Sequence, residues 1–260
     1  MTGTRSFILG SLARATLPLL GTSTAAAEEL RPLSTDRPDT TESARTVDAG
    51  HFQLEMDVAR LTVDEGQKGF GFVASNLKLG LTHFWDVQLV IEPLVGHEAL
   101  PDYGWGYGDT VLRTKLNLFG NDEDTALAVM PWVKFPTAGK RGNDAVEGGL
   151  IVPLGFTLPL DFSGTVMAEG DVMADEAGGG RHFELLTSAS VGRELFGPVA
   201  AFIEIAGVYS TEADAGYVLF VDGGPVVLVT DYVQLDAAAG VGLTDAADDF
   251  TVFTGVSFKL

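Results

Sequence analysis

The chain has 260 residues, of which 46% are hydrophobic and 20% charged, with a formal net charge of −20 and no cysteine. The missing cysteine excludes disulfides, thiolate metal ligands and cysteine catalysis. The excess of acidic over basic residues argues against a nucleic-acid partner, because phosphate binding needs positive charge. No apolar run beyond the N-terminus is long enough for a membrane-spanning helix.

Residues 1–27 have the pattern of a secretory signal peptide. Arg5 begins a basic region, Phe7 to Leu20 is mostly apolar, and Ala25 to Ala27 provide a small-residue cleavage site. We expect export through this cleaved signal; the alternative is an unusual, disordered N-terminus. Residues 28–48 are polar, contain proline and show no periodicity, which predicts an extended segment that could plug the domain following it.

Residues 49–260 alternate between apolar and polar side chains in one run after another. The clearest run is Thr110 to Leu118, where Leu112, Leu116 and Leu118 oppose Arg113 and Lys115. This period of two residues is typical of a strand with one apolar and one charged face. Each run is about ten residues long, which is the length a tilted strand needs to cross a bilayer. We predict about 12 strands, an even number, as bacterial outer-membrane barrels have.

The predicted connections alternate in kind along the chain. One set is longer and rich in glycine and charge, including the polar stretch Asp64 to Gly69, while the other consists of short turns. Each short turn carries an aromatic residue: Trp85, Phe119, Phe162, Phe196 or Tyr232. Short turns on one side, long loops on the other and an aromatic girdle predict a closed antiparallel up-and-down transmembrane β-barrel. Outer-membrane lipid and the barrel-assembly machinery would be its partners. A soluble β-sandwich or jelly roll, which also alternates, is the alternative.

Four segments carry a resemblance to a known family: STDRPDTTESARTVDAGHFQLE, LTHFWDVQL, GYGDTVLRTKLNLFG and WVKFPTAG. In order and spacing they resemble the outer-membrane family labelled "putative MetA-pathway of phenol degradation", often called simply "transporter". The resemblance spans nearly the whole mature chain. It implies an outer-membrane barrel that passes hydrophobic or aromatic compounds, and it implies no catalytic residues. The ending Phe258-Lys259-Leu260 departs from the terminal aromatic residue common in outer-membrane proteins.

Charged residues in the middle of strands are the main functional candidates. An Arg or Lys facing lipid near the bilayer centre costs about 2–4 kcal/mol, so these residues should line the lumen. Arg113 and Lys115 should pair with acids across the lumen, and structural pairing is an alternative to solute binding for the whole set. The lumen-lining candidates are Glu55, Asp57, Lys78, Glu92, Arg113, Lys115, Lys134, Glu169, Asp171, Glu184, Glu204, Asp222 and Asp236.

A glycine-rich outer loop holds three aromatic residues, Tyr103, Trp105 and Tyr107, of which Trp105 and Tyr107 could collect an aromatic solute by stacking. The sequence offers no frame for catalysis or metal binding. His51, His83, His97 and His182 have no partner at metal-ligand spacing, and no G-x-S-x-G motif surrounds any serine. We therefore expect no catalytic residue, no metal and no cofactor.

These observations predict a channel or passive transporter for a small solute in the outer membrane of a Gram-negative bacterium. Two alternatives stay open. One is a non-transporting barrel that stabilises the membrane or displays surface loops. The other is a secreted soluble β-sandwich that binds a ligand.

Overall fold

The computed structural model describes residues 30–98, 104–175 and 179–260. The chain divides into a unit of Met1–Leu30 and a unit of Arg31–Leu260, and the second unit is described below. The predicted signal peptide, residues 1–27, and Tyr103 lie outside the described residues. None of the helices in the described part of the chain is long and apolar enough to span a membrane.

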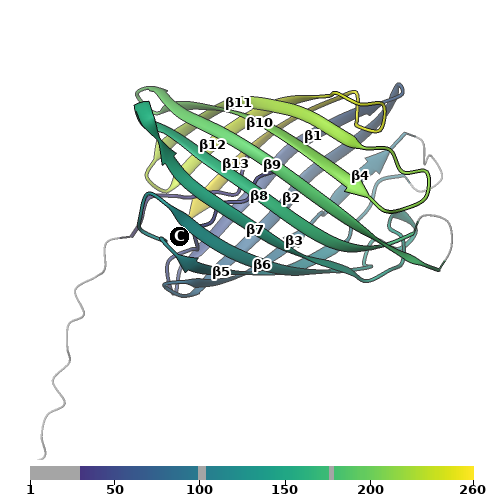
Figure 1. Cartoon of the computed structure of the whole chain (residues 1–260), viewed down its shortest axis with the longest axis horizontal. Coiled ribbons are helices and arrows are strands. Elements are labelled where there is room, and N and C mark those ends of the chain that lie inside the picture. The colour runs from purple at the N-terminus through teal and green to yellow at the C-terminus, as the bar shows by residue number, and fades with distance from the viewer. Residues whose placement is uncertain (1–29, 99–103, 176–178) are drawn as a thin grey trace, which may run out of the picture. The chain divides into compact units, whose positions relative to one another are not determined.

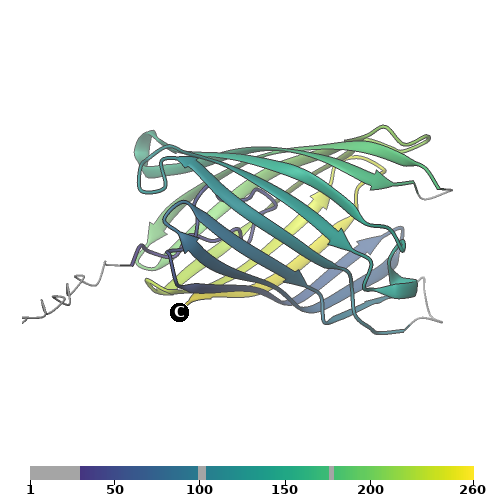
Figure 2. The same ribbon diagram turned by 90° about the horizontal axis from the view of Figure 1, so that it is seen from below.

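Thirteen strands between Phe52 and Lys259 form one antiparallel sheet that closes on itself as a barrel (Figures 1 and 2). Closure is achieved by β1, which pairs with β13 on one side and with β2 on the other. The strands are β1 (Phe52–Asp64), β2 (Gln67–Thr82), β3 (Trp85–Ile91), β4 (Leu94–His97), β5 (Thr110–Phe119), β6 (Ala126–Phe135), β7 (Glu147–Leu158), β8 (Phe162–Ala174), β9 (Arg181–Phe196), β10 (Val199–Ser210), β11 (Val218–Thr230), β12 (Val233–Gly242) and β13 (Phe250–Lys259). Two short 3-10 helices, η1 (Gly139–Arg141) and η2 (Pro159–Asp161), lie in connections.

Strands β3 and β4 occupy one position in the barrel, because both pair with β2. Glu92 and Pro93 separate them, and Pro93 has no N–H to donate to the ladder. The barrel therefore has 12 strand positions and one extra short strand, which confirms the predicted closed antiparallel up-and-down barrel. Glu92, predicted within a strand, lies in this interruption instead.

The connections alternate between the two ends of the barrel. The short turns span 83–84, 120–125, 159–161, 197–198 and 231–232, and the C-terminus lies at the same end (Figure 1). The connections at the other end span 65–66, 98–109, 136–146, 175–180, 211–217 and 243–249. The predicted loop from Asp64 to Gly69 is wrong: Glu65 and Gly66 alone turn the chain, both with positive φ (47° and 79°). Such a two-residue turn matches the twist of a hairpin, so the polar residues around it continue the strands.

Burial is inverted relative to a soluble protein. Lys115 and Glu204 are each only 1% exposed, whereas Ile203 is 60% and Leu118 56% exposed. Alternation along each strand separates the charged inner face from the apolar outer face. This is the pattern of a barrel whose outer face meets lipid. Exposed Trp85, Phe119 and Phe196 add aromatic side chains at the short-turn end, as predicted.

The alternation changes phase once in β1 and once in β2. The register between β1 and β13 shifts between Asp57 and Ala59, and Val73, the residue of β2 at the same level, has φ of 58°. A bulge of this kind adds one residue and reverses which side chains face inward. As a result Arg60 faces the lumen, where its guanidinium lies 5.1 Å from the centre of the buried Phe253 ring.

Candidate functional site: the barrel interior

Residues 31–48 lie among the inward-facing side chains of the barrel. The segment is not part of a strand: its Leu33 N–H donates to Asp231 O at 2.9 Å, and an isolated bridge at Ala49 follows its end. Most of its backbone donors therefore need other partners. Side chains from the strands supply them. The partners of the segment's backbone and side chains include Gln53, Glu55, Asp57, Lys78, Asp86, Arg113, Lys115, Asn117, Ser188, Glu204, Gln234, Asp236 and Lys259.

Glu204 of β10 anchors the middle of this segment. Its carboxylate accepts hydrogen bonds from the backbone N–H groups of Thr40 and Thr41, at 2.6 and 2.8 Å, and also from the Thr41 hydroxyl. The Thr41 hydroxyl is also 2.6 Å from the hydroxyl of Ser188 on β9. Hydrogen bonds to a charged group are the stronger kind, so this carboxylate fixes the segment in the lumen.

A buried cluster of two lysines and two carboxylates holds the beginning of the segment. Lys115 Nζ lies 2.6 Å from Asp36 Oδ1, and Lys78 contacts both Asp36 and Glu55. All four side chains are less than 5% exposed. Because each charge has an opposite partner, the cluster tolerates a burial that would be costly for any single member.

Arg37 forms a second buried cluster with β1 and β12. Its guanidinium pairs with Asp57 and lies 2.7 Å from Asp236 Oδ1. It also lies 5.6 Å from the centre of the Phe253 ring, within cation–π range. Gly255 lies directly beside the guanidinium, and a Cβ at this position would make Arg37 shift.

Arg113 and Lys115 pair with acids, as predicted, but these acids do not come from the opposite wall of the barrel. Arg113 Nη1 lies 2.6 Å from Glu42, and Lys115 pairs with Asp36, so both acids come from the segment rather than from facing strands. A lumen filled by a segment of the same chain offers closer partners than the opposite wall.

The structure divides the lumen candidates into two groups. Seven of them contact residues 31–48: Glu55, Asp57, Lys78, Arg113, Lys115, Glu204 and Asp236. For the other six, no hydrogen bond or ion pair to the segment is found among the described residues: Glu92, Lys134, Glu169, Asp171, Glu184 and Asp222. Of these, Lys134 bridges Asp109 and Glu147 at 3.1 and 2.6 Å, and Asp171 accepts a hydrogen bond from the Trp132 indole.

Several interior charges were not predicted from the sequence. Asp36, Arg37 and Glu42 belong to a segment without periodicity, so no face could be assigned to them. Arg60 was not predicted as a lumen residue. If the strict alternation of faces continued beyond Val58, the Arg60 side chain would lie on the outer face. Two adjacent apolar residues, Val58 and Ala59, are the one sequence signal of the phase change.

Of the predicted loop aromatics, Trp105 lies away from the lumen. Gly71 pairs with the inward Arg60, so its neighbours Phe70 and Phe72 face outward. Trp105 packs against both rings, with centroids at 5.9 and 5.6 Å. Trp105 and Tyr107 are 50% and 40% exposed, and the outward placement of Trp105 favours contact with the membrane interface over solute capture.

Two cavities flank Pro38 and Asp39, which line both of them. The cavity toward the long loops, about 510 Å³, is also lined by Arg60, Asp222 and Phe253. The cavity toward the short turns, about 490 Å³, includes Arg37, Asp161, Ser163, Arg193 and Glu194 in its lining. Residues 38–39 therefore separate an outer chamber from an inner chamber.

The chain shares this architecture with known proteins. The family model described as "Putative MetA-pathway of phenol degradation" matches residues 35–260. An outer membrane channel from Pseudomonas putida F1 is similar over 84% of this chain and 98% of its own, with a TM-score of 0.63 and 12% identity. The NanC porin is similar over 80% of this chain and 100% of its own, with a TM-score of 0.56 and 11% identity. No curated protein matches the chain by sequence.

Proposed function

The chain belongs to the family described as "Putative MetA-pathway of phenol degradation", and on that premise we propose that it is an outer-membrane channel for a small solute. The observation that supports this most directly is the charged, hydrogen-bonding interior of a closed barrel with an apolar outside. Such an interior is compatible with water and polar solutes. The closed, hydrogen-bonded sheet with its apolar outer face is compatible with the surrounding lipid.

We further propose that residues 31–48 narrow the channel and set what passes. The segment is held by hydrogen bonds and ion pairs, and water can replace such contacts when the segment moves. The narrowest point would be at Pro38 and Asp39, between the two chambers. Phe220 and Phe253 in the outer chamber would suit a small hydrophobic or aromatic compound, the class that the family's description suggests. This proposal assigns no catalytic role to any residue.

Residues 1–27 would direct export and be removed, so that the protein reaches the outer membrane of a Gram-negative cell as a chain starting at Glu28. The mass of the protein extracted from outer-membrane fractions checks this. A mass that includes residues 1–27 would contradict it.

The channel proposal is tested by single-channel conductance with a reversible cross-link. Thr41 and Ser188 have hydroxyls 2.6 Å apart on the segment and on β9, and the chain has no cysteine. The double variant Thr41→Cys/Ser188→Cys therefore introduces the sole pair of thiols. We expect discrete conductance steps when this variant is reduced, and smaller or rarer steps when it is oxidised. Each single variant, treated with the same oxidant, is the control.

The possible outcomes separate the candidate functions. Equal steps in both redox states would support a channel whose segment stays in place. The absence of steps in both states, in protein that keeps heat-modifiable gel mobility, would contradict a channel. It would favour a barrel that stabilises the membrane or displays loops.

A further inference from the structure

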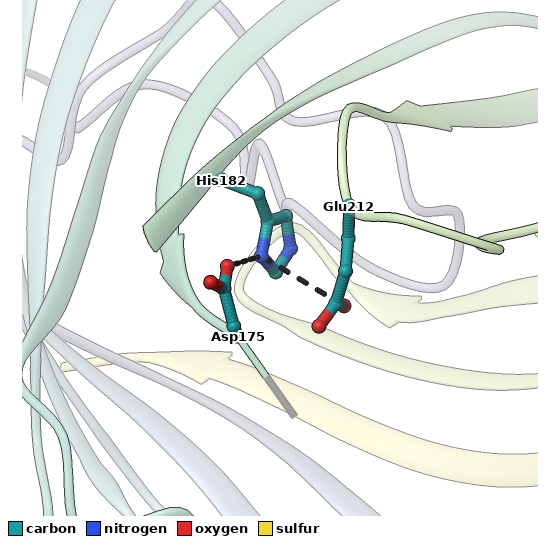
Figure 3. Close-up of side chains that lie close together, drawn as sticks. All are labelled: Asp175, His182 and Glu212. Atoms are coloured by element: carbon teal, nitrogen blue, oxygen red, sulfur yellow. Dashed lines mark hydrogen bonds and ion pairs between the residues drawn. The ribbon is translucent and has the colours of Figure 1, made fainter. Parts of the chain in front are cut away.

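Three ionisable side chains at or just beyond the ends of neighbouring strands meet at the long-loop end of the barrel (Figure 3). Asp175 directly follows β8, His182 is near the start of β9, and Glu212 follows β10. His182 Nδ1 lies 3.0 Å from Asp175 Oδ1 and 3.8 Å from Glu212 Oε2. One ligand atom from each of the three residues can be chosen so that all lie within 4.8 Å of one another.

The other imidazole nitrogen has its own partner. His182 Nε2 lies 3.2 Å from Glu184 Oε1, and Glu184 is the next inward residue along β9. If Nε2 carries the proton and donates it to Glu184, the lone pair of Nδ1 points toward Asp175 and Glu212. A carboxylate behind the second ring nitrogen is what metal-binding histidines usually have.

Backbone geometry brings these residues together. The N–H of Asp175 donates to Gly180 O at 3.2 Å and closes the loop between β8 and β9. A Cβ at position 180 would overlap the Asp175 carboxylate, so glycine lets that side chain fold toward His182. The N–H of Thr211 donates to Phe183 O at 2.9 Å, which keeps Glu212 beside β9.

The imidazole of His182 lies among carboxylates. Its side chain is only 6% exposed, yet three carboxylates surround a ring that carries at most one positive charge. Within the described residues, the ion pairs of Asp175 and Glu184 all go to His182. A cation with more than one charge would therefore attract Asp175 and Glu184 more strongly than a singly protonated ring does.

We propose that Asp175, His182 and Glu212 form a binding site for a divalent transition-metal ion at the outer mouth of the lumen, with Glu184 as a positioning residue. A zinc ion with ligand bonds of about 2.0–2.1 Å in tetrahedral geometry holds its ligand atoms about 3.3 Å apart. The two distances from Nδ1, 3.0 and 3.8 Å, bracket that separation. An imidazole with two carboxylates suits zinc better than calcium or magnesium, which prefer oxygen ligands alone. Binding needs a neutral imidazole with its lone pair on Nδ1, so a protonated ring would release its Nδ1 proton to solvent.

The test is a titration of the full-length protein in detergent with ZnCl₂ after chelator treatment, followed by calorimetry. We expect one zinc ion bound per chain, with affinity at least about tenfold weaker in His182→Ala and in Glu212→Gln. Glu184→Ala should weaken binding by about ten- to a hundredfold through loss of the ring's orientation. Zinc should also raise the temperature at which the native protein loses its compact gel mobility, and it should not do so in His182→Ala.

His83→Ala is the matched control. His83 also lies near a carboxylate, 3.0 Å from Asp122, but at the short-turn end and with 60% of its side chain exposed. This variant should bind zinc as the native chain does. Failure of the native chain to bind zinc, or unchanged affinity in His182→Ala, would overturn the proposal and leave His182 as a hydrogen-bonding residue of the rim. The measurement reads binding alone, so its outcome is independent of whether the barrel conducts.

Discussion

At the scale of single residues, Lys78 shows why the interior needs matched charges. Its ammonium group contacts Asp36 from the segment and Glu55 from β1, and it is only 2% exposed. Lys115 still pairs with Asp36 if Lys78 is removed, but among the described residues Glu55 keeps only neutral donors, the Gln53 amide and the Asp36 N–H. The cost of losing Lys78 should therefore come mainly from Glu55.

Lys78→Met should lower the free energy of unfolding by about 3–5 kcal/mol, because it leaves a buried charge without its partner. Urea unfolding of the barrel in lipid vesicles measures this. The double variant Lys78→Met/Glu55→Gln should recover part of the lost free energy, since it also removes the unpaired charge of the Glu55 carboxylate. Lys134→Met, which breaks a more exposed pair at the long-loop end, should cost less. If Lys78→Met costs no more than Lys134→Met, the cluster does not stabilise the fold in this way.

At the scale of strands, the fold could be predicted because alternation and charge agree. In β5 the apolar Leu112 and Leu118 face outward and Lys115 faces inward, as the sequence indicated. The agreement ends where the backbone departs from a regular strand. The bulge near Val58 reverses the phase of β1, and Pro93 divides one predicted strand into β3 and β4. A bulge depends on register with a neighbouring strand, which a single sequence does not display.

Long-range pairing limited the site prediction more severely. Asp36 and Lys115 are 79 residues apart, and Thr41 and Glu204 are 163 apart. Nothing in the local sequence links them, since the two residues of each pair lie in stretches far apart along the chain. His182 and Glu212 likewise meet only because β9 and β10 are neighbours in the barrel. Sequence spacing therefore correctly described each histidine as isolated along the chain but missed its neighbours in space.

The lipid-facing side of β10 provides a test of the membrane assignment at this scale. Ile203 lies near the middle of the strand and Tyr209 near its long-loop end, both exposed on the outer face. Ile203→Arg should destabilise the barrel by about 2–4 kcal/mol, and Tyr209→Arg by about 0–1 kcal/mol, because the cost depends on depth in the bilayer. Unfolding in lipid vesicles compares the two. Equal small costs for both variants would mean that β10 does not face hydrocarbon.

At the scale of the whole molecule, the two chambers differ in charge. The outer chamber is lined by Asp39, Glu42, Asp222 and Asp248 against a single arginine, Arg60. The inner chamber has a more even lining, with Asp39, Asp161 and Glu194 against Arg37 and Arg193. Acidic residues lining a passage with low-dielectric walls raise the local concentration of cations. The outer chamber should therefore dominate the ion preference of an open channel.

An open channel should accordingly prefer potassium over chloride, measured as the reversal potential in a KCl gradient. The preference should shrink as the mean salt concentration rises, because the Debye length falls from about 10 Å at 0.1 M to about 3 Å at 1 M. Asp222→Asn should reduce the preference, since Asp222 lines the outer chamber and the substitution removes a carboxylate from that lining. Asp161→Asn, in the evenly charged inner chamber, is the matched control and should change the preference less. A preference for chloride, or one independent of salt, would show that ions do not pass through the acidic outer chamber.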